Sequence, residues 1–511
     1  MNYLYYSATP LDSQNTAVLI DNAYTVLNTE LDSHVYFLIC DGFPNNFCEF
    51  NFEKSCFRCL ECKFVNKTIF RRVNKNNRFT LLKISDFINK NKYQYSQNVF
   101  PHNLQELKKL EYNGINIGYG IVSSFVSITR NIKPEFNDVT SAFFDNFISS
   151  SKALIDVLFK ITEQIDVSYI KVFNGRYGLI RPLVEFARFK GISYSTFEKP
   201  APYEKVSRMV EYKNAMPHTI SYRTKFINDV WEQSANPEKN KIASSFYENR
   251  RNGIAAADKV YIDHQVKGML PDNFDSSKRN FVIFNSSEDE IFSIDNDWEE
   301  KSLLGSQVQG IQKICELLNP HKDIHLYLRV HPNLKGIPFY YADSIAQSLK
   351  QFDNITVIPS ESPISTYDLL DVCEKCIIFG SSVGVEANFW GVPSILLSGS
   401  YYYYLDVCYI PHGIEELENL LLKHLEPKSK LGCLKYSYAL MEQNIGYHYH
   451  YFDFNMGKIK FAGKILEYAK GIKILGSSYL YRMLCILCRV INFKRHESFI
   501  KTLSLLGKEE K

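Results

Sequence analysis

Short apolar runs alternate with helical patterns along residues 280–397, and this alternation constrains the fold more than any other feature of the chain. Such a chain needs right-handed crossovers between strands, which makes the strands parallel and covers both faces of their sheet with helices. The apolar runs are 280–285, 324–330, 355–358, 376–379 and 394–397, and the helical patterns are 305–318, 341–351, 365–374 and 384–390. This pattern predicts a doubly wound, Rossmann-like α/β domain.

The first part of the chain shows a looser version of the same pattern. Apolar runs at 3–8, 34–40, 169–173 and 192–197 predict strands, and the segments 13–31, 137–163 and 178–190 predict helices. We therefore expect a first Rossmann-like domain over 1–250 with a Cys-rich insertion at about 41–100, a second domain over 251–425, and a C-terminal helical tail over 426–511.

Composition limits the classes of protein to consider. The 511 residues suffice for two large α/β domains, and the apolar share of 45% is ordinary for a globular chain. The net charge of +3, with both signs intermixed, argues against a nucleic-acid binder. The sequence contains no uncharged apolar run of membrane-spanning length and no signal-peptide pattern at its start. Twelve cysteines in such a chain indicate reduced thiols or metal ligands in a cytoplasmic protein.

A histidine follows the predicted strand 324–330. Pro332 disfavours helical backbone at His331, so this side chain is expected to project into the loop at the strand end. An imidazole there can assist the departure of a phosphate as a general acid or hydrogen-bond donor. Arg329 alternates with His331 toward the same side, and Asn333 is expected to fix the turn or to reach a nucleotide base. The alternative is a histidine that is satisfied in a surface turn.

Two serine pairs follow other strands of the same domain. Ser381-Ser382 precedes a helix, where hydroxyls, free N–H groups and the helix dipole favour an anion. Ser286, Ser287 and Glu288 follow the strand 280–285, where they can bind a phosphate and orient a ribose or a polar acceptor, or simply begin a helix. Together with His331, the Ser381-Ser382 turn predicts that a nucleoside mono- or diphosphate is the leaving group.

The order of these motifs resembles that of bacterial surface-polysaccharide glycosyltransferases with the two-domain GT-B fold. This group includes capsule-polysaccharide enzymes, and the His-Pro and Ser-Ser motifs resemble those of bacterial sialyl- and Kdo transferases. The resemblance is carried by HLYLRVHPNLKG (325–336), GSSVGVEANFWGVPSILL (380–397), FNSSEDEIFSI (284–294), ADKVYID (257–263) and VFNGRYGLIRP (172–182).

The resemblance implies roles for four of these residues. His331, Ser381 and Ser382 would contact the phosphate and nucleoside of the donor, and Glu386 would hold ribose hydroxyls. The alternative for Glu386 is an acid that complements the helix dipole. The resemblance further implies two domains that face a cleft, and catalysis that requires no metal or other cofactor.

Polar residues also follow the predicted strands of the first domain. Asn174 and Arg176 come after 169–173, and the planar guanidinium suits a phosphate or an acidic sugar. Asp41 and Glu198 end two other strands, and either carboxylate is a candidate base for deprotonating an acceptor hydroxyl. The alternative for Asp41 is a turn-forming Asp-Gly pair.

Four cysteines, Cys48, Cys56, Cys59 and Cys62, lie within fifteen residues. Four thiolates can close a tetrahedral structural zinc site, although the spacing also resembles part of an iron–sulfur run. The alternative is an insertion with ordinary reduced thiols.

The segment 471–496 is apolar with interspersed basic residues. It is too charged to span a bilayer, but a basic amphipathic helix can lie on an anionic membrane surface. The alternative is a helix that packs back across both domains.

Together these features predict a cytoplasmic glycosyltransferase that acts in capsule, O-antigen or lipopolysaccharide synthesis. If the segment 471–496 binds the membrane surface, the enzyme is peripheral at the inner face of the cytoplasmic membrane. It would move a sugar from a CMP- or UDP-linked donor to a surface-polysaccharide or lipid-linked glycan. The alternatives are a nucleotide-sugar epimerase or polyol-phosphate transferase of the same fold, and a non-catalytic polysaccharide-assembly protein.

Overall fold

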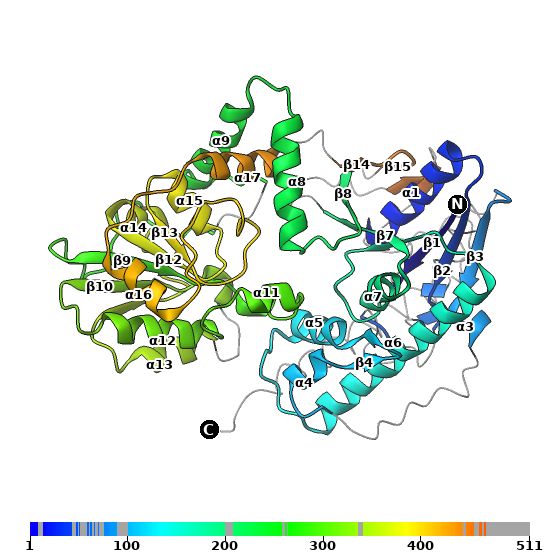
Figure 1. The fold of residues 1–511 in the computed structure, drawn as a ribbon, viewed down its shortest axis with the longest axis horizontal. Coiled ribbons are helices and arrows are strands. Elements are labelled where there is room, and N and C mark those ends of the chain that lie inside the picture. Colours follow the sequence, from blue (N-terminus) through cyan, green and yellow to red (C-terminus); the bar gives the residue numbers. More distant parts are fainter. Residues whose placement is uncertain are drawn as a thin grey trace. The chain divides into compact units, whose positions relative to one another are not determined.

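The computed structural model describes two compact α/β units (Figure 1). Unit 1 contains the described residues up to Pro217 and those from Gly446 onward, and unit 2 contains those between His218 and Ile445. The described residues are 1–8, 14–42, 47–49, 51, 59, 60, 62, 63, 66, 70, 76–88, 101–199, 208–257, 261, 262, 264–335, 341–442, 446–453, 459–461 and 464–466.

Unit 1 is built on a seven-stranded sheet with the order β14-β8-β7-β6-β1-β2-β3. Its strands are β1 (Asn2–Ser7), β2 (His34–Ile39), β3 (Phe79–Lys83), β6 (Tyr169–Phe173), β7 (Ser193–Glu198), β8 (Arg208–Lys213) and β14 (Tyr447–His448). The five strands from β3 to β7 in this order are parallel, whereas β8 and β14 each pair antiparallel with their neighbour. The chain reverses its direction of winding between β1 and β6.

Helices cover both faces of this sheet. Figure 1 shows α1 on one face and α6 with α7 on the other. The elements are α1 (Gln14–Thr29), α3 (Ile84–Phe87), α4 (Leu104–Lys108), α5 (Gly118–Thr129), α6 (Asp138–Gln164), α7 (Arg181–Lys190) and the hairpin β4 (Glu111–Tyr112) and β5 (Ile115–Asn116). A reciprocal pair of bonds between Asn137 and Thr140 begins α6, and Gly191, at φ +67°, ends α7.

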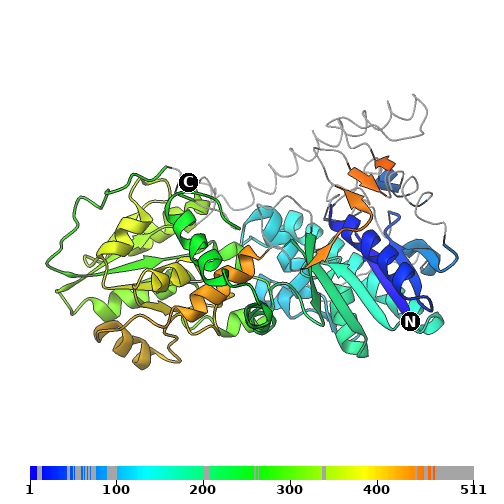
Figure 2. The ribbon, with the colours of Figure 1, turned by 90° about the horizontal axis from the view of Figure 1, so that it is seen from above.

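The returning segment 446–453 is held by one buried carboxylate of α1. Asp21 accepts hydrogen bonds from the backbone N–H groups of His450 (2.9 Å), Tyr451 (2.7 Å) and Phe452 (2.8 Å), and from the Tyr447 hydroxyl. Figure 2 shows this segment, in orange, beside the dark blue α1. The Tyr-His repeat at 447–451 therefore attaches the end of the chain to unit 1.

Unit 2 is built on a five-stranded parallel sheet with the order β11-β10-β9-β12-β13. The strands are β9 (Arg279–Phe284), β10 (Ile324–Arg329), β11 (Ile355–Ile358), β12 (Lys375–Ile378) and β13 (Ser394–Leu396). The order reverses between β9 and β12, as in the doubly wound mononucleotide-binding arrangement.

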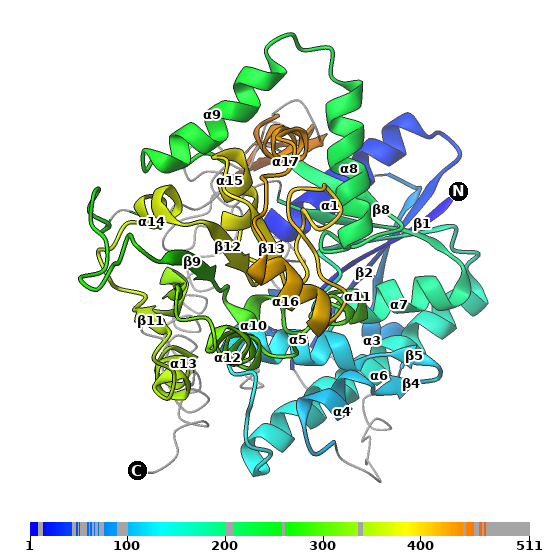
Figure 3. The same ribbon diagram turned by 60° about the vertical axis from the view of Figure 1, so that its left-hand side comes forward.

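The helices of unit 2 fall into a layer around the sheet and a separate packed group. The first are α10 (Glu288–Ile291), α11 (Asn296–Glu300), α12 (Gln307–Leu318), the 3₁₀ turn η2 (Pro332–Leu334), α13 (Tyr341–Leu349), α14 (Thr366–Val372), α15 (Val383–Phe389) and α16 (Ile414–Leu422). The group consists of α8 (Ile220–Gln233), α9 (Lys239–Arg251) and α17 (Leu431–Met441), which lie together in Figure 3. The Tyr247 hydroxyl of α9 donates to the Cys433 carbonyl of α17 at 2.6 Å, and Trp231 of α8 packs against Tyr438.

Two mainly parallel sheets with helices on both faces confirm the expected two-domain, GT-B-like α/β fold. That the two domains face a cleft stays a prediction. The expected boundary near 250 differs from the structure, where unit 2 already begins at His218 because α8 and α9 pack on α17.

The C-terminal region also differs from the expected helical tail over 426–511. The helix α17 belongs to unit 2, and β14 and the small antiparallel sheet of β15 (Phe452–Asp453), β16 (Ile459–Phe461) and β17 (Lys464–Leu466) follow it. The amphipathic segment 471–496 lies outside the described residues and stays a prediction. Among the helices that are described, none is long and apolar enough to cross a membrane.

Candidate functional site

The carboxyl ends of β9, β10 and β12 meet where the strand order of unit 2 reverses. Ligands of open α/β sheets bind in the crevice at this position. Gly380, at φ +73°, follows β12, and a Cβ added to it would lie 3.4 Å from Ser286 Oγ and 3.2 Å from Ser398 Oγ. The predicted Ser286 and Ser381 loops are therefore neighbours, and glycine permits both their close approach and the left-handed backbone.

The loop that carries His331 is tied to the same crevice. Asn285, the first residue after β9, accepts a hydrogen bond from the His331 backbone N–H at 2.9 Å. The His331 ring lies edge-on to Tyr261, with ring centroids 5.3 Å apart. The structure thus brings His331 and the Ser286 loop together.

Hydrogen bonding selects the tautomer of His331. The backbone N–H of Asn333 donates to His331 Nδ1 at 3.1 Å. Because a backbone N–H is only a donor, Nδ1 carries no proton, and a neutral ring has its proton on Nε2. The Asn333 side chain donates to Glu290 Oε1 at 2.7 Å, so Asn333 fixes the turn, one of its two predicted roles.

The serines after β9 are held by helix residues. Gln307 of α12 accepts from the Ser286 backbone N–H (3.1 Å) and donates to Ser286 Oγ (2.9 Å). Ser287 is buried at the N-cap position of α10, and its hydroxyl donates to Asp289 Oδ1 at 2.6 Å. Glu288 is the first residue of α10. For Ser287 this geometry favours a role in shaping the loop.

A buried ion pair supports the Ser381-Ser382 turn. Glu386 is 3% exposed, and its carboxylate contacts Arg250 Nη2 at 3.0 Å and the Tyr367 hydroxyl at 2.6 Å. Ser382 Oγ donates to the same carboxylate at 3.2 Å, and Arg250 Nη2 lies 3.4 Å from Ser382 Oγ. Both Glu386 oxygens have protein partners, which favours a role in holding the turn over one in binding ribose.

Arg250 is a residue that sequence reasoning missed. It comes from the last turn of α9 and places a buried guanidinium at the Ser382 turn, 132 positions away in the chain. A cation there favours a bound phosphate. No local pattern marks Arg250, because a basic residue at the end of a helix is ordinary.

Arg329 holds a neighbouring loop. It is 2% exposed and donates to the carbonyls of Pro359 and, at 3.1 Å, Ser362, both in the segment after β11. Burial lowers the pKa of its guanidinium to about 10. These contacts favour a structural role for Arg329 over direct donor binding.

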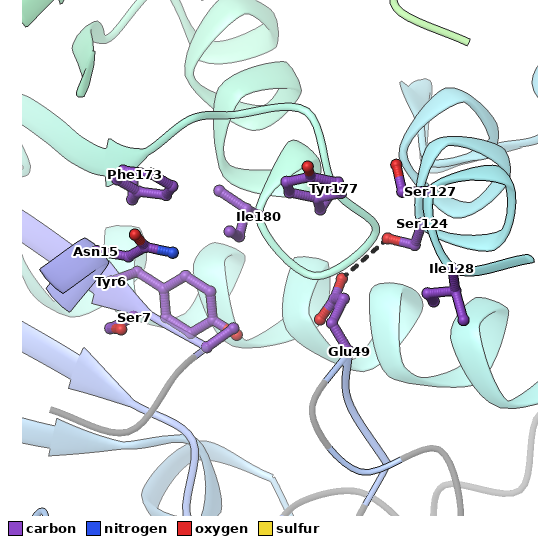
Figure 4. A pocket seen from close by; sticks show the side chains of 11 residues that line it. Tyr6, Ser7, Asn15, Glu49, Ser124, Ser127, Ile128, Phe173, Tyr177 and Ile180 are labelled. Carbon is purple, nitrogen blue, oxygen red and sulfur yellow. Dashed lines mark hydrogen bonds between the residues drawn. The ribbon is translucent and has the colours of Figure 1, made fainter. Parts of the chain in front are cut away.

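Unit 1 has a cavity of about 240 Å³ at the carboxyl ends of β1 and β6, where its own strand order reverses (Figure 4). The lining residues come from both strands, from the Cys-rich insertion, and from the segments that begin α1, form α5 and precede α7. They are Tyr6, Ser7, Ala8, Asn15, Glu49, Ser124, Ser127, Ile128, Phe173, Tyr177 and Ile180.

Glu49 is the acidic residue of this lining, and sequence reasoning missed it. Its Oε1 accepts from the Leu179 backbone N–H at 2.8 Å and from Ser124 Oγ at 3.2 Å. Its Oε2 is buried and has no hydrogen-bond partner among the described residues. Burial raises the pKa of the carboxyl above its ordinary value of 4.5, although these bonds oppose the shift. Glu49 lies in the Cys-rich insertion, which has no periodicity to signal it.

The predicted polar residues of unit 1 lie outside this lining. Asn174, at φ +60°, donates to Glu198 and accepts from the Arg176 backbone N–H at 3.0 Å, so the structure brings these three together. Arg176 is buried, and its Nε donates to Ser123 Oγ at 2.5 Å. Asp41 instead accepts from the Ser85 backbone N–H in α3 at 3.4 Å.

The cysteine prediction is only partly covered by the structure. Asn51 Nδ2 lies 3.3 Å from Cys59 Sγ, and Asn66 Nδ2 lies 3.8 Å from Cys62 Sγ. Among the described residues, which include Cys48 but not Cys56, no three His, Cys, Asp or Glu side chains are grouped to hold a metal. A four-cysteine site stays a prediction.

Comparison with protein-family models and with curated proteins gave no match. Among solved structures, KpsC of Thermosulfurimonas dismutans, a β-Kdo 2,4 transferase, aligns at 14% identity and a TM-score of 0.34, over 63% of this chain and 87% of that one. A putative UDP-N-acetylglucosamine 2-epimerase from Listeria monocytogenes aligns at 10% identity and a TM-score of 0.24, over 88% and 92%. At these TM-scores the likenesses assign the chain to no family.

Proposed function

We propose that this protein is a glycosyltransferase that moves a sugar from a nucleotide-sugar donor to a glycan acceptor. The observation that carries the proposal is the convergence of His331, Ser286 and the Ser381-Ser382 turn at the reversal point of the unit 2 sheet. Arg250 adds a buried cation to that turn. Hydroxyl donors, a cation and an imidazole at one crevice suit a nucleotide phosphate that gains charge as the glycosidic bond breaks.

In this mechanism His331 donates from Nε2 to the departing phosphate, because its Nδ1 is engaged by the Asn333 N–H. The Arg250 guanidinium lies at the Ser382 turn, where its positive charge favours a phosphate. The Glu386 carboxylate holds Arg250 and the Ser382 hydroxyl in place. We propose that unit 1 binds the acceptor and that transfer needs no metal or other cofactor. By motif resemblance, we further propose a CMP- or UDP-linked donor, a surface-polysaccharide or lipid-linked acceptor, and a cytoplasmic enzyme that contacts the membrane through 471–496.

The test is a thermal-shift panel of CMP-, UDP-, GDP- and CDP-linked sugars on the full chain. A true donor at a hundredfold excess over its Kd should stabilise the protein by about 2.7 kcal/mol. Replacing Ser382 by a bulky leucine should abolish the shift, whereas Ser245→Leu on the half-buried part of α9 is the control. Failure of all four nucleotide classes to shift the melting temperature would contradict the proposal, and conversion of the donor sugar without an acceptor would indicate an epimerase.

A further inference from the structure

We infer that the unit 1 cavity binds a single neutral sugar ring, with Glu49 Oε2 accepting a hydrogen bond from one sugar hydroxyl. This inference rests on the proposed function, because the sugar in the cavity would belong to the acceptor of the proposed transfer. The binding itself can be measured without any transfer reaction.

One oxygen of the Glu49 carboxylate has no hydrogen-bond partner among the described residues. One side of the carboxylate is fixed by Leu179 and Ser124, and Ser124 is itself fixed because its Oγ accepts from the Gly178 N–H at 2.8 Å. The other oxygen, Oε2, is buried without a hydrogen-bond partner among the described residues. Buried acceptors are normally satisfied, so a rigidly held, unpaired oxygen on a residue that lines a cavity indicates a ligand that supplies the donor. A hydroxyl group is such a donor.

The charge of the cavity lining distinguishes a neutral ligand from an acidic one. Among the described residues that line the cavity, Glu49 is the only one with a carboxyl group, and none is Lys, Arg or His. A second carboxylate placed beside Glu49 would meet like charge in a desolvated site without a compensating cation. Arg176, the residue predicted to hold an acidic sugar, is instead buried against Ser123 and outside the lining. The cavity therefore favours a neutral sugar over an acidic one.

The volume and the side chains of the cavity suit one sugar ring. Figure 4 shows the Glu49 side chain between Tyr6 and Ser124, with Tyr177 and Ser127 above it. Aromatic rings can cover the C–H face of a sugar while Ser, Asn and carboxylate groups meet its hydroxyls. At about 240 Å³ the cavity is smaller than the ~300–1,000 Å³ typical of pockets for drug-sized ligands. One ring fits this volume better than a nucleotide sugar.

The experiment is saturation-transfer NMR and calorimetry on the full chain with methyl glycosides of glucose, galactose, N-acetylglucosamine and glucuronic acid. At least one neutral glycoside should bind, and the glucuronide should not. Glu49→Gln keeps Oε1 as an acceptor for Leu179 and Ser124 but replaces Oε2 with a donor, so it should weaken binding about tenfold or more. Glu111→Gln, on an exposed acid of β4, is the matched control and should bind as wild type does.

A second variant keeps the inference testable if Glu49→Gln unfolds. Ser127 is an exposed lining residue of α5, so Ser127→Trp should block the cavity and abolish glycoside binding without loss of the fold. Three results would overturn the inference. They are equal glycoside binding by the wild type and either variant, tighter binding of the glucuronide than of the neutral glycosides, and no binding of any neutral glycoside. Donor-induced thermal shifts on the same samples separate the two claims: shifts without glycoside binding refute only this inference, and absent shifts refute the proposed function.

Discussion

At the residue scale, the Glu49 carboxyl links stability to pH. Its pKa is raised above 4.5 by burial, so the folded chain holds this proton more tightly than the unfolded chain does. Its contribution to the free energy of unfolding should therefore fall as pH rises from about 4.5 through the raised pKa. We predict that Glu49→Gln becomes more stable relative to wild type across this window.

Urea titrations of wild type, Glu49→Gln and Glu111→Gln at a series of pH values test this sign. The difference in free energy of unfolding between Glu49→Gln and wild type should grow with pH. The same difference for Glu111→Gln, at an exposed acid, should change little with pH. A Glu49 difference that shrinks with rising pH would show that the carboxyl is more acidic in the folded state.

A second prediction at the residue scale concerns Glu386. Replacing it by glutamine leaves the buried Arg250 guanidinium without its carboxylate, and breaking one side of a buried pair typically costs ~3–5 kcal/mol. The matched surface change is Glu238→Gln, whose partner Lys241 is mostly exposed and whose loss should cost less than ~1 kcal/mol. Equal losses in urea unfolding would mean that the Arg250 pair is not desolvated.

At the scale of elements, periodicity alone predicts most of both sheets. The expected strands 280–285, 324–330 and 394–397 correspond to β9, β10 and β13, because buried parallel strands are apolar runs bounded by turns. The same reasoning places His331 and the Ser381-Ser382 turn at the carboxyl ends of parallel strands. It does not predict the side chains that hold these loops, because Gln307, Arg250 and Tyr367 reach them through tertiary packing.

The attachment of 446–453 to α1 yields a prediction at this scale. Asp21→Ala removes the acceptor of three backbone N–H groups, and each hydrogen bond to a charged group contributes ~1.5–3 kcal/mol. Hydrogen exchange at the amides of His450, Tyr451 and Phe452 should rise by at least tenfold. Asp32→Ala, at an exposed acid, is the control, and unchanged exchange in Asp21→Ala would show that other contacts hold the segment.

At the scale of the whole molecule, long-range pairing explains why the expected boundaries differ from the structure. The strand β14 pairs with β8 although more than 200 residues separate them, and α17 packs on α8 and α9. No local pattern encodes such pairings. Glu49 was missed for a related reason, since its partners Ser124 and Leu179 are remote in sequence.

The segment 471–496 carries a prediction for the full chain. If it forms a basic interfacial helix, the protein should sediment with anionic vesicles and detach as salt rises, because attraction to the surface decays within a Debye length of ~8–10 Å. A chain that ends at Lys470 should remain in the supernatant. Equal sedimentation of both chains would contradict a membrane role for this segment.

In the proposed mechanism, the unit 2 crevice activates a nucleotide-sugar donor through His331. The most direct measurement is the rate of nucleotide release from the donor that shifts the melting temperature most, with a neutral glycan acceptor present. His331→Ala should melt as wild type does and lower this rate roughly 10²-fold, the size typical of losing acid or electrostatic assistance. His424→Ala, at an exposed histidine of the same unit, should keep the wild-type rate. Wild-type release by His331→Ala would contradict the account.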